Sequence, residues 1–341
     1  MLDEIAIGGF WAGFCSYDLG RGIEHVDTRT PAAADVPDIA FVRFGEVREV
    51  DVLPPLPAPR VDLGPARSNL TRAEHAARIE AVHELLTAGE CYQVNVTRRL
   101  EFDADPDPLA LFAALTRANP APYAGVLSFG PAQPGLALVS ASPELFLRVD
   151  GRAVETRPIK GTAVSPAWLR ASAKDRTENV MIVDLARNDL GRVCTYGSVT
   201  VPDLCAVEEH PGLHHLVSTV RGTLRDDVGW ADLVRATFPP ASVTGAPKPR
   251  VMQAIEDLEP VRRGAYCGAF GWIDARGPEP RAGLAVAIRT FTIAGGRTYF
   301  GVGGGIVADS DPGAEWAETE LKAARLLAAT GAQELQPVPA P

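Results

Sequence analysis

Two glutamates and a lysine near the C-terminus have a spacing that could build part of a metal site. Glu315, Glu318 and Lys322 lie three and four residues apart, so a helix would carry them on one face. A solvent-exposed face with an ion pair is the simpler interpretation. However, the segment closely follows three glycines at 303–305, and backbone without side chains can approach an anion. A sharp turn explains the glycines equally well, so the residues alone leave both interpretations open.

Glu178 is a candidate metal ligand from a second segment. It lies in a stretch crowded with charged residues, where we expect Asp184, Arg187 and Asp189 to form ion pairs and helix caps. That leaves Glu178 free for a metal ion. Mg²⁺ prefers one or two carboxylates together with water and ligand oxygens, so glutamates from separate helices would suit it. The sequence contains no HExxH, EF-hand or P-loop motif that would indicate a different site.

Lys160 and Glu144 form a third candidate site. Lys160 stands between Ile159 and Gly161, a setting typical of a strand that enters a turn. A surface lysine whose stem covers apolar neighbours is one interpretation. In the other, burial lowers the pKa of the amine, so that Lys160 can act as a nucleophile.

His214, His215 and Arg289 are the remaining polar candidates. Neighbours in a strand point to opposite faces, so at most one of the two histidines faces a given pocket. An inward histidine is more often a core residue, although its pKa near neutrality also suits acid or base catalysis. Arg289 is flanked by apolar residues and could either clamp a carboxylate or pair with a buried acid.

The composition is that of an ordinary globular chain. The 341 residues include 43 acidic and 33 basic side chains, and the net charge of −10 disfavours a nucleic-acid partner. Five cysteines at wide spacings, without a C-x-x-C motif, support neither a disulfide framework nor a zinc site. The N-terminus lacks the basic start of a secretory signal, and no apolar run approaches the ~18 residues of a membrane span. We therefore expect a cytoplasmic protein without a membrane partner.

Hydrophobic spacing predicts an α+β fold. Helices are expected over residues 71–89, 108–120, 166–186, 226–239, 247–260 and 313–331, the first with a start signal at Thr71 and Glu74. Strands are expected over 1–20 (a short pair), 41–52, 91–103, 123–163, 197–224 and 266–309. The strands follow one another in hairpin-like series, not in βαβ order, which favours antiparallel or mixed sheet with helices outside. No linker follows residue 66, so we expect one domain.

Eight longer motifs resemble those of the chorismate-utilising enzyme family. They keep the family's order over most of residues 68–328. The motifs are GECYQVNVTRRL, SPELF, TRPIKGT, KDRTENVMIVDLARNDLGRV, HHLVSTVRGTL, FPPASVTGAPKPRVMQAIEDLEPVRRGAYCGAFGW, AIRT and GGGIVADSDPGAEWAETELKAARLL. The resemblance implies two large, mostly antiparallel sheets in a sandwich with helices outside. It also implies a shortened N-terminal segment (1–67) that adds strands, a chorismate-binding catalytic region (68–330) and a disordered tail (331–341).

The resemblance assigns a role to each candidate residue. Glu178 and Glu318 match the family's Mg²⁺ carboxylates, with Glu315 and Lys322 as supporting groups beside them. Glu144 matches the general acid/base, Lys160 the nucleophile, and His215, not His214, the active-site histidine. The positions that match substrate contacts are Arg289, Tyr266, the amides of Gly303, Gly304 and Gly305, Thr244 and Ser198.

Lys160 and Gln93 imply which member of the family the chain resembles. Anthranilate-forming members have alanine in the P-I-x-G-T motif, whereas the aminodeoxychorismate-forming branch has lysine, as here. The resemblance therefore implies that Lys160 attacks C2 of chorismate and that ammonia then enters at C4, giving 4-amino-4-deoxychorismate for folate and 4-aminobenzoate. Isochorismate and salicylate synthases have a lysine at the position of Gln93 to activate water, and glutamine cannot do so. Anthranilate, isochorismate or salicylate synthesis, or a non-catalytic truncated relative, remain alternatives.

The ammonia source is expected to be a second protein. None of the five cysteines lies in a G-x-C-x-G nucleophile elbow, so the resemblance implies a separate glutamine amidotransferase subunit. Family members usually have a longer segment before the region that matches Ala12–Gly20. That segment carries much of the tryptophan-binding site, so we do not expect regulation by tryptophan. Either the start codon is misassigned or the architecture is reduced, and a partner would then cover the exposed sheet edge.

Overall fold

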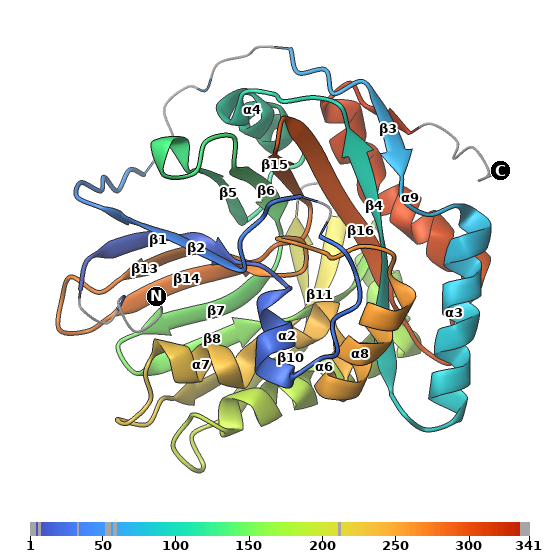
Figure 1. The fold of residues 1–341 in the computed structure, drawn as a ribbon. Coiled ribbons are helices and arrows are strands. Elements are labelled where there is room, and N and C mark those ends of the chain that lie inside the picture. The colour runs from blue at the N-terminus through green and yellow to red at the C-terminus, as the bar shows by residue number, and fades with distance from the viewer. Residues whose placement is uncertain are drawn as a thin grey trace.

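Two antiparallel sheets with helices outside them make up the computed structural model, which describes residues 5, 8–32, 34–51, 56, 60–210 and 213–334. Figure 1 shows strands β1, β13, β14, β7 and β8 at the lower left and strands β5, β6, β15, β16 and β4 toward the upper right. The predicted α+β fold class is confirmed. No helix in these described ranges combines the length and the apolar character that crossing a membrane requires.

Within the described residues, the first sheet has nine strands. In spatial order they are β10 (Thr200–His210), β11 (Leu213–Thr223), β8 (Ala153–Arg157), β7 (Leu145–Asp150), β14 (Arg281–Val286), β13 (Ala269–Asp274), β1 (Phe10–Cys15) and β2 (Ile39–Phe44). The ninth strand, β9 (Ile159–Ala163), pairs with β11 outside this order. Segments far apart in the sequence therefore meet here, because the N-terminal strand β1 lies between β2 and β13.

The second sheet has eight strands in the part of the chain that the structure describes. In order they are β17 (Gln333–Glu334), β3 (Pro65–Ser68), β4 (Gln93–Phe102), β16 (Arg297–Ile306), β15 (Thr290–Ala294), β6 (Ala137–Ser142) and β5 (Tyr123–Ser128), with β12 (Gly245–Ala246) paired to β4. Only β17 and β3 run parallel among these pairs. β15 pairs with β16 only as far as Phe300, whereas β4 continues to Ile306. Residues 301–306 of β16 are therefore paired with β4 but not with β15, and this side of the strand is its released edge.

Helices cover the outer faces of both sheets. On the eight-stranded sheet lie α3 (Arg72–Thr87), α4 (Pro108–Ala118) and α9 (Pro312–Ala329). Against β9, β10 and β11 packs α6 (Ala173–Gly191), which follows the short α5 (Pro166–Ala171). The other helices are α2 (Leu19–Glu24), α7 (Trp230–Thr237) and α8 (Lys248–Leu258), with 3₁₀ turns η1 (Gly130–Ala132) and η2 (Ala241–Val243). Figure 1 shows α3 and α9 along the right side, with α6, α7 and α8 below the sheets.

Buried apolar side chains join the two sheets. Phe14 and Phe270 of the nine-stranded sheet pack in one cluster with Leu138 of the eight-stranded sheet. A larger cluster joins the nine-stranded sheet to α6, α7 and α8, and another joins the eight-stranded sheet to α4 and α9. Burying this surface is the main stabilising term, and it fixes the two sheets against each other.

The structure corrects three details of the sequence analysis. The helix expected over 166–186 is two helices, because Ser172 is extended and its hydroxyl accepts a hydrogen bond from Asp175 N, which starts α6 anew. The strand pair expected over residues 1–20 is one strand, β1, followed by α2; residues 1–4, 6 and 7 lie outside the described part. The glycines at 303–305 lie inside β16 and do not form the sharp turn that was one interpretation of them.

The division of the chain into three parts stays a prediction. Residues 1–67 contain β1 and β2 of the first sheet and part of β3 of the second. The segment expected to be a disordered tail, residues 331–341, contains β17. Residues 335–341 of this segment lie outside the described part.

Candidate active site

The glycines of β16 form a bare stretch of backbone between two groups of charged side chains. A β-carbon on Gly304 would lie 3.1 Å from Glu315 Oε2 and 3.9 Å from Glu318 Oε1. A β-carbon on Gly305 would instead lie 2.6 Å from Gln93 Nε2 and 3.1 Å from Lys160 Nζ. Since neighbours along a strand face opposite sides, β16 separates the two groups by only the thickness of a backbone. This is the close approach for which glycine is needed.

The acidic group lies on α9 and α6, as the spacing of the glutamates predicted. Lys322 Nζ is 2.7 Å from Glu318 Oε1 and donates a hydrogen bond to Gly303 O at 2.8 Å. Glu315 is buried and accepts a 2.6 Å hydrogen bond from the Ser310 hydroxyl. Position 315 follows the N-cap Asp311, whose side chain accepts from the backbone of the first turn. The start of α9 therefore fixes where its carboxylates lie.

Lys174 joins the carboxylates of the two helices. Its Nζ lies 3.9 Å from Glu178 Oε1 and 4.0 Å from Glu315 Oε1, so an ammonium stands between the two acids. Burial raises the pKa of Glu178 and of Glu315. Burial alone would raise the pKa of Glu318 too, but its ion pair with Lys322 lowers it instead.

These carboxylates fit a hard divalent cation. Within the described ranges, no three His, Cys, Asp or Glu side chains are already gathered as a complete metal site. Mg²⁺ does not need such a set, because one or two protein carboxylates with ligand oxygens and water suffice. The positive charge of Lys174 already compensates two of these carboxylates, Glu178 and Glu315, and Glu318 lies one helical turn from Glu315 on α9. The donor set is therefore compatible with Mg²⁺.

Lys160 points into the interior, not into bulk solvent. It belongs to β9, its side chain is half-buried, and its Nζ lies 3.1 Å from the position of a β-carbon on Gly305. Burial lowers the pKa of its amine, while Glu178 and Glu144 oppose this and Lys322 adds to it. The surface interpretation of Lys160 is thus wrong for this structure. A larger share of its amine is unprotonated at neutral pH than for an exposed lysine.

Glu144 lies between β6 and β7 and is only 4% exposed. Its backbone is held in place, since Glu144 N donates to the Ser142 hydroxyl and Val286 N donates to Glu144 O. Burial raises the pKa of the carboxyl to about 7, and the Ser242 hydroxyl and Lys160 reduce this effect. The group can therefore be either a proton donor or an acceptor near neutral pH.

The two histidines of β11 face opposite sides, as expected for strand neighbours. His215 is 2% exposed, and its Nδ1 lies 2.9 Å from the Thr162 hydroxyl on β9. His214 is half-buried and its Nδ1 is 3.1 Å from Val164 O. Only His215 faces the interior. It pairs with Thr162 of β9, and Thr162 lies two residues along that strand from Lys160.

Arg289 and Tyr266 are two of the side chains expected to contact the substrate. The backbone of Arg289 has a φ of +51°, which is strained for a residue other than glycine. A hydrogen bond that Ala141 N donates to Arg289 O holds this conformation. Burial lowers the pKa of Arg289, with Arg325 adding to the effect and Glu144 opposing it. Arg289 thus carries a charge near Glu144 without a close ion pair among the described residues. The Tyr266 ring stacks on β16, since a β-carbon on Gly301 would lie 2.2 Å from its Cδ1.

Thr244 and Ser198 do not contribute free groups to this region. The Thr244 hydroxyl donates to Pro240 O, and Thr244 O accepts from Asn95 N, so Thr244 supports β4 from behind. The Ser198 hydroxyl donates to Thr195 O and accepts from Thr223 N. Thr223 lies eight residues along β11 from His215, roughly 26 Å in a strand. The structure places Ser198 in a distant turn, not in the substrate pocket that the motif implied.

Sequence reasoning missed several residues that complete the site. Lys174 is four residues before Glu178, and this spacing on a helix was a signal that could have identified it. Ser242, Ser310 and Thr162 gave no such signal, because they reach the site only through the tertiary fold. Gln93 is fully buried, and neither its amide oxygen nor its amide nitrogen has a hydrogen-bond partner within the protein. A buried amide without partners is rare in folded proteins, and a bound water or ligand is one explanation for it.

The arrangement defines a class of protein: an enzyme with an interior amine, a carboxyl that titrates near neutrality and a carboxylate cluster suited to Mg²⁺. The chain belongs to the chorismate binding enzyme family, whose model matches residues 45–328. It is a chorismate-utilising enzyme. The expected family is thereby confirmed.

Individual relatives divide between two reactions. The chain is 38% identical over 348 residues to aminodeoxychorismate synthase component 1 of Klebsiella aerogenes, covering 92% of this chain and 76% of that protein. It is also 38% identical over 330 residues to "anthranilate synthase component 1 1" of Haloarcula marismortui, covering 90% and 66%. The crystal structure of anthranilate synthase component I from Streptococcus pneumoniae TIGR4 matches with a TM-score of 0.82 and 26% identity, covering 95% of this chain and 85% of that one.

Proposed function

We propose that this chain aminates chorismate at C4, forming 4-amino-4-deoxychorismate through a covalent adduct of Lys160. The observation that supports this most directly is the position of the Lys160 amine, 3.1 Å from where a side chain at Gly305 would begin. There it faces the bare strand that separates it from the carboxylate cluster. An alanine at position 160 would leave this space open to an external nucleophile.

The chemistry follows from two exchanges at the ring. The free amine of Lys160 attacks C2, the ring double bonds shift, and the C4 hydroxyl leaves. Glu144 donates the proton with which the hydroxyl departs as water. Ammonia then attacks C4, the double bonds shift back, and the C2–N bond to Lys160 breaks. The Glu144 carboxylate takes up the proton that the incoming ammonia loses, so one ammonia is consumed and one water is released.

Substrate carboxylates have matching partners in the site. Arg289, strained and without a close acidic partner among the described residues, would hold one carboxylate of chorismate. On the released edge of β16, alternate glycine amides do not pair with β15 and could donate to the same group. Glu178 and Glu318, with Glu315 and Lys322 beside them, would hold Mg²⁺. Mg²⁺ bound there would neutralise the ring carboxylate of the substrate.

Ammonia, rather than water, suits the surroundings of Gln93. Its amide can hold a nucleophile by hydrogen bonds but cannot remove a proton from water. Neutral ammonia needs no such base. We expect a glutamine amidotransferase subunit to supply it, because the relatives are named as component 1 of a synthase and all five cysteines here are buried.

The decisive experiment is identification of the amine product. The purified chain is given chorismate, Mg²⁺ and ammonium, and the product is converted with a lyase and identified as 4-aminobenzoate or 2-aminobenzoate. We expect the 4-amino product, and a covalent mass shift on Lys160 during turnover. Lys160→Ala should lose both, and Lys160→Arg should lose both while keeping the positive charge, which separates the role of the nucleophile from that of the charge.

Anthranilate synthesis is the second candidate, supported by the Haloarcula marismortui relative. In that case 2-aminobenzoate would be the main product and Lys160→Ala would keep it. That result would refute the amination at C4. Glu178→Ala and Glu318→Ala should each abolish Mg²⁺-dependent turnover; full activity of either variant would overturn the metal assignment.

A further inference from the structure

Lys174 joins the two helices that carry the carboxylate cluster (Glu178, Glu315 and Glu318). It lies in the first turn of α6, and its ammonium nitrogen is 3.9 Å from Glu178 Oε1 on the same helix and 4.0 Å from Glu315 Oε1 on α9. Glu318 interacts electrostatically with Lys174 as well. One positive charge is thus shared by the three carboxylates that the proposed function places at the Mg²⁺ site.

The local sequence does not favour a lysine at this position. The first turn of a helix is the positive end of the helix dipole, which stabilises acidic side chains and disfavours cations. Asp175, the next residue, follows this preference, whereas Lys174 does not. A lysine four residues before a glutamate is also the weaker order for an ion pair on a helix. The attraction of the carboxylates, one of them on another helix, offsets these local costs.

Lys174 is held loosely, in contrast to Lys322, the other lysine beside these carboxylates. Lys322 Nζ is 2.7 Å from Glu318 Oε1 and donates a hydrogen bond to Gly303 O at 2.8 Å, so two short contacts fix it. Both distances from Lys174 to its acids are longer than a hydrogen bond, and 54% of its side chain is exposed. The Lys174 ammonium can therefore move into solvent, whereas that of Lys322 is tied to the strand.

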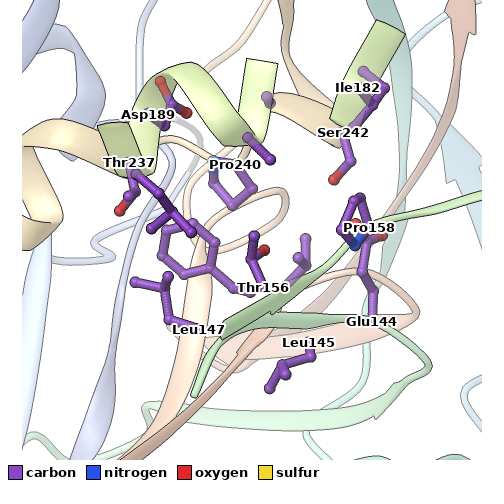
Figure 2. Close-up of a pocket in the computed structure, with 15 residues that line it drawn as sticks. Glu144, Leu145, Leu147, Thr156, Pro158, Ile182, Asp189, Thr237, Pro240 and Ser242 are labelled. Carbon is purple, nitrogen blue, oxygen red and sulfur yellow. The ribbon is translucent and has the colours of Figure 1, made fainter. Parts of the chain in front are cut away.

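The rest of α6 is anchored independently of Lys174. Further along the helix, Ile182, Ala186 and Asp189 line a cavity of about 30 Å³ behind Glu144, and Figure 2 shows Ile182 and Asp189 beside it. The helix also contributes side chains to the large buried apolar cluster of the nine-stranded sheet. A substitution at Lys174 therefore changes the charge beside the carboxylates and leaves the packing of α6 in place.

We propose that Lys174 is an internal counter-ion that takes the place of the metal when none is bound. Its ammonium keeps the carboxylates of α6 and α9 together in the metal-free chain. The same oxygens, Glu178 Oε1 and Glu315 Oε1, face Lys174 and would face Mg²⁺, so Lys174 leaves them when the metal binds. Lys174 is thus a positioning residue that keeps the empty site assembled and lowers its affinity for the metal. The inference rests on the proposed function, which takes these carboxylates as the metal site.

Lys174→Met tests the proposal, because methionine has a similar length and helix propensity but no charge. Mg²⁺ is titrated calorimetrically into the purified, chelator-treated chain without chorismate, at constant pH and ionic strength. We expect Lys174→Met to bind Mg²⁺ about tenfold more tightly than the wild type, because no cation competes for the carboxylates. Lys174→Arg keeps the charge and should bind Mg²⁺ like the wild type. Unchanged or weaker binding by Lys174→Met would overturn the proposal.

The stability of the metal-free chain is the second measurement. Without metal, Lys174→Met should have a lower free energy of unfolding in denaturant than the wild type. Since Lys174 lies in solvent once the metal is bound, this loss should equal the gain in metal binding, about 1.4 kcal/mol for a tenfold change. The difference in stability should therefore disappear at saturating Mg²⁺. A difference of the same size with and without Mg²⁺ would show that Lys174 does not exchange with the metal.

Arg176→Met is the matched control, because Arg176 is an exposed cation near the start of the same helix without an acidic partner among the described residues. Equal effects of Arg176→Met and Lys174→Met would show a general effect of charge and refute the proposal. Glu178→Gln tests the metal site itself and should weaken Mg²⁺ binding at least about tenfold. If it binds Mg²⁺ like the wild type, the metal assignment of the proposed function fails, and the role of Lys174 with it. Weaker binding by Glu178→Gln with no change in Lys174→Met refutes only the role of Lys174.

Discussion

Replacing Glu144 by glutamine should stabilise the folded protein at alkaline pH while abolishing turnover. In the unfolded chain the carboxyl loses its proton near its ordinary pKa of 4.5, whereas burial raises its pKa to about 7 in the folded chain. Between these values the folded state binds one proton more than the unfolded state. Stability therefore falls as pH rises, by about 1.4 kcal/mol per pH unit, until the folded state also ionises.

Glutamine has nearly the same size and no charge, so the variant lacks this pH-dependent loss. Between pH 5 and pH 8 the stability of Glu144→Gln relative to the wild type should increase by about 2.5 kcal/mol. Any hydrogen bond that the amide loses to Ser242 would shift both values equally, which is why the difference between the two pH values is the quantity to measure.

Denaturant unfolding at the two pH values, without chorismate or metal, measures this difference. Glu80→Gln, at an exposed position of α3, is the control for a glutamate-to-glutamine change as such. Parallel stability curves for wild type and Glu144→Gln would refute the reasoning, because they would show that Glu144 ionises alike in folded and unfolded chains.

Three further substitutions test how the fold holds the site. Thr71→Ala removes the capping box at the start of α3 and should lower the free energy of unfolding by about 1 kcal/mol, with activity unchanged. Arg263→Ala leaves the buried Glu259 carboxylate without its 2.7 Å ion pair and should cost about 3–5 kcal/mol in the same unfolding measurement. Gly305→Ala places a methyl group 2.6 Å from Gln93 Nε2 and 3.1 Å from Lys160 Nζ; we expect turnover to fall by roughly 10²-fold, and wild-type turnover in a folded variant would contradict a role in the site.

Local sequence patterns predicted the elements of this fold better than their boundaries. The capping box at Thr71 and the spacing on α9 are interactions between residues three or four apart, and the sequence contains all of their information. The helix breaks at Ser172 because this one residue leaves the helical conformation. The spacing of apolar residues does not reveal such a change. The strand expected to run through the glycines at 303–305 is present, because pairing with β4 carries β16 through to Ile306.

The site could be predicted only where residues already belonged to recognisable motifs. Lys160, Glu144 and the glutamates of α6 and α9 were proposed in this way, and their roles stay predictions. Ser198 was misplaced, because a motif does not tell which end of a long strand a turn occupies. The cavity behind Glu144 had no signal in the sequence, since its walls come from segments between Glu144 and Val286 that only the packing brings together.

One physical cause acts on both groups of the proposed reaction, the Glu144 carboxyl and the Lys160 amine. Burial raises the pKa of the Glu144 carboxyl and lowers the pKa of the Lys160 amine, because the charged form of each loses solvation. Their mutual attraction opposes both shifts but is the smaller effect at each residue. The pair is thereby moved toward its neutral state, a free amine and a protonated acid, and these are the forms that the proposed attack on C2 and the proposed departure of the C4 hydroxyl would require. A change that lets water reach either residue should therefore weaken both the nucleophile and the acid.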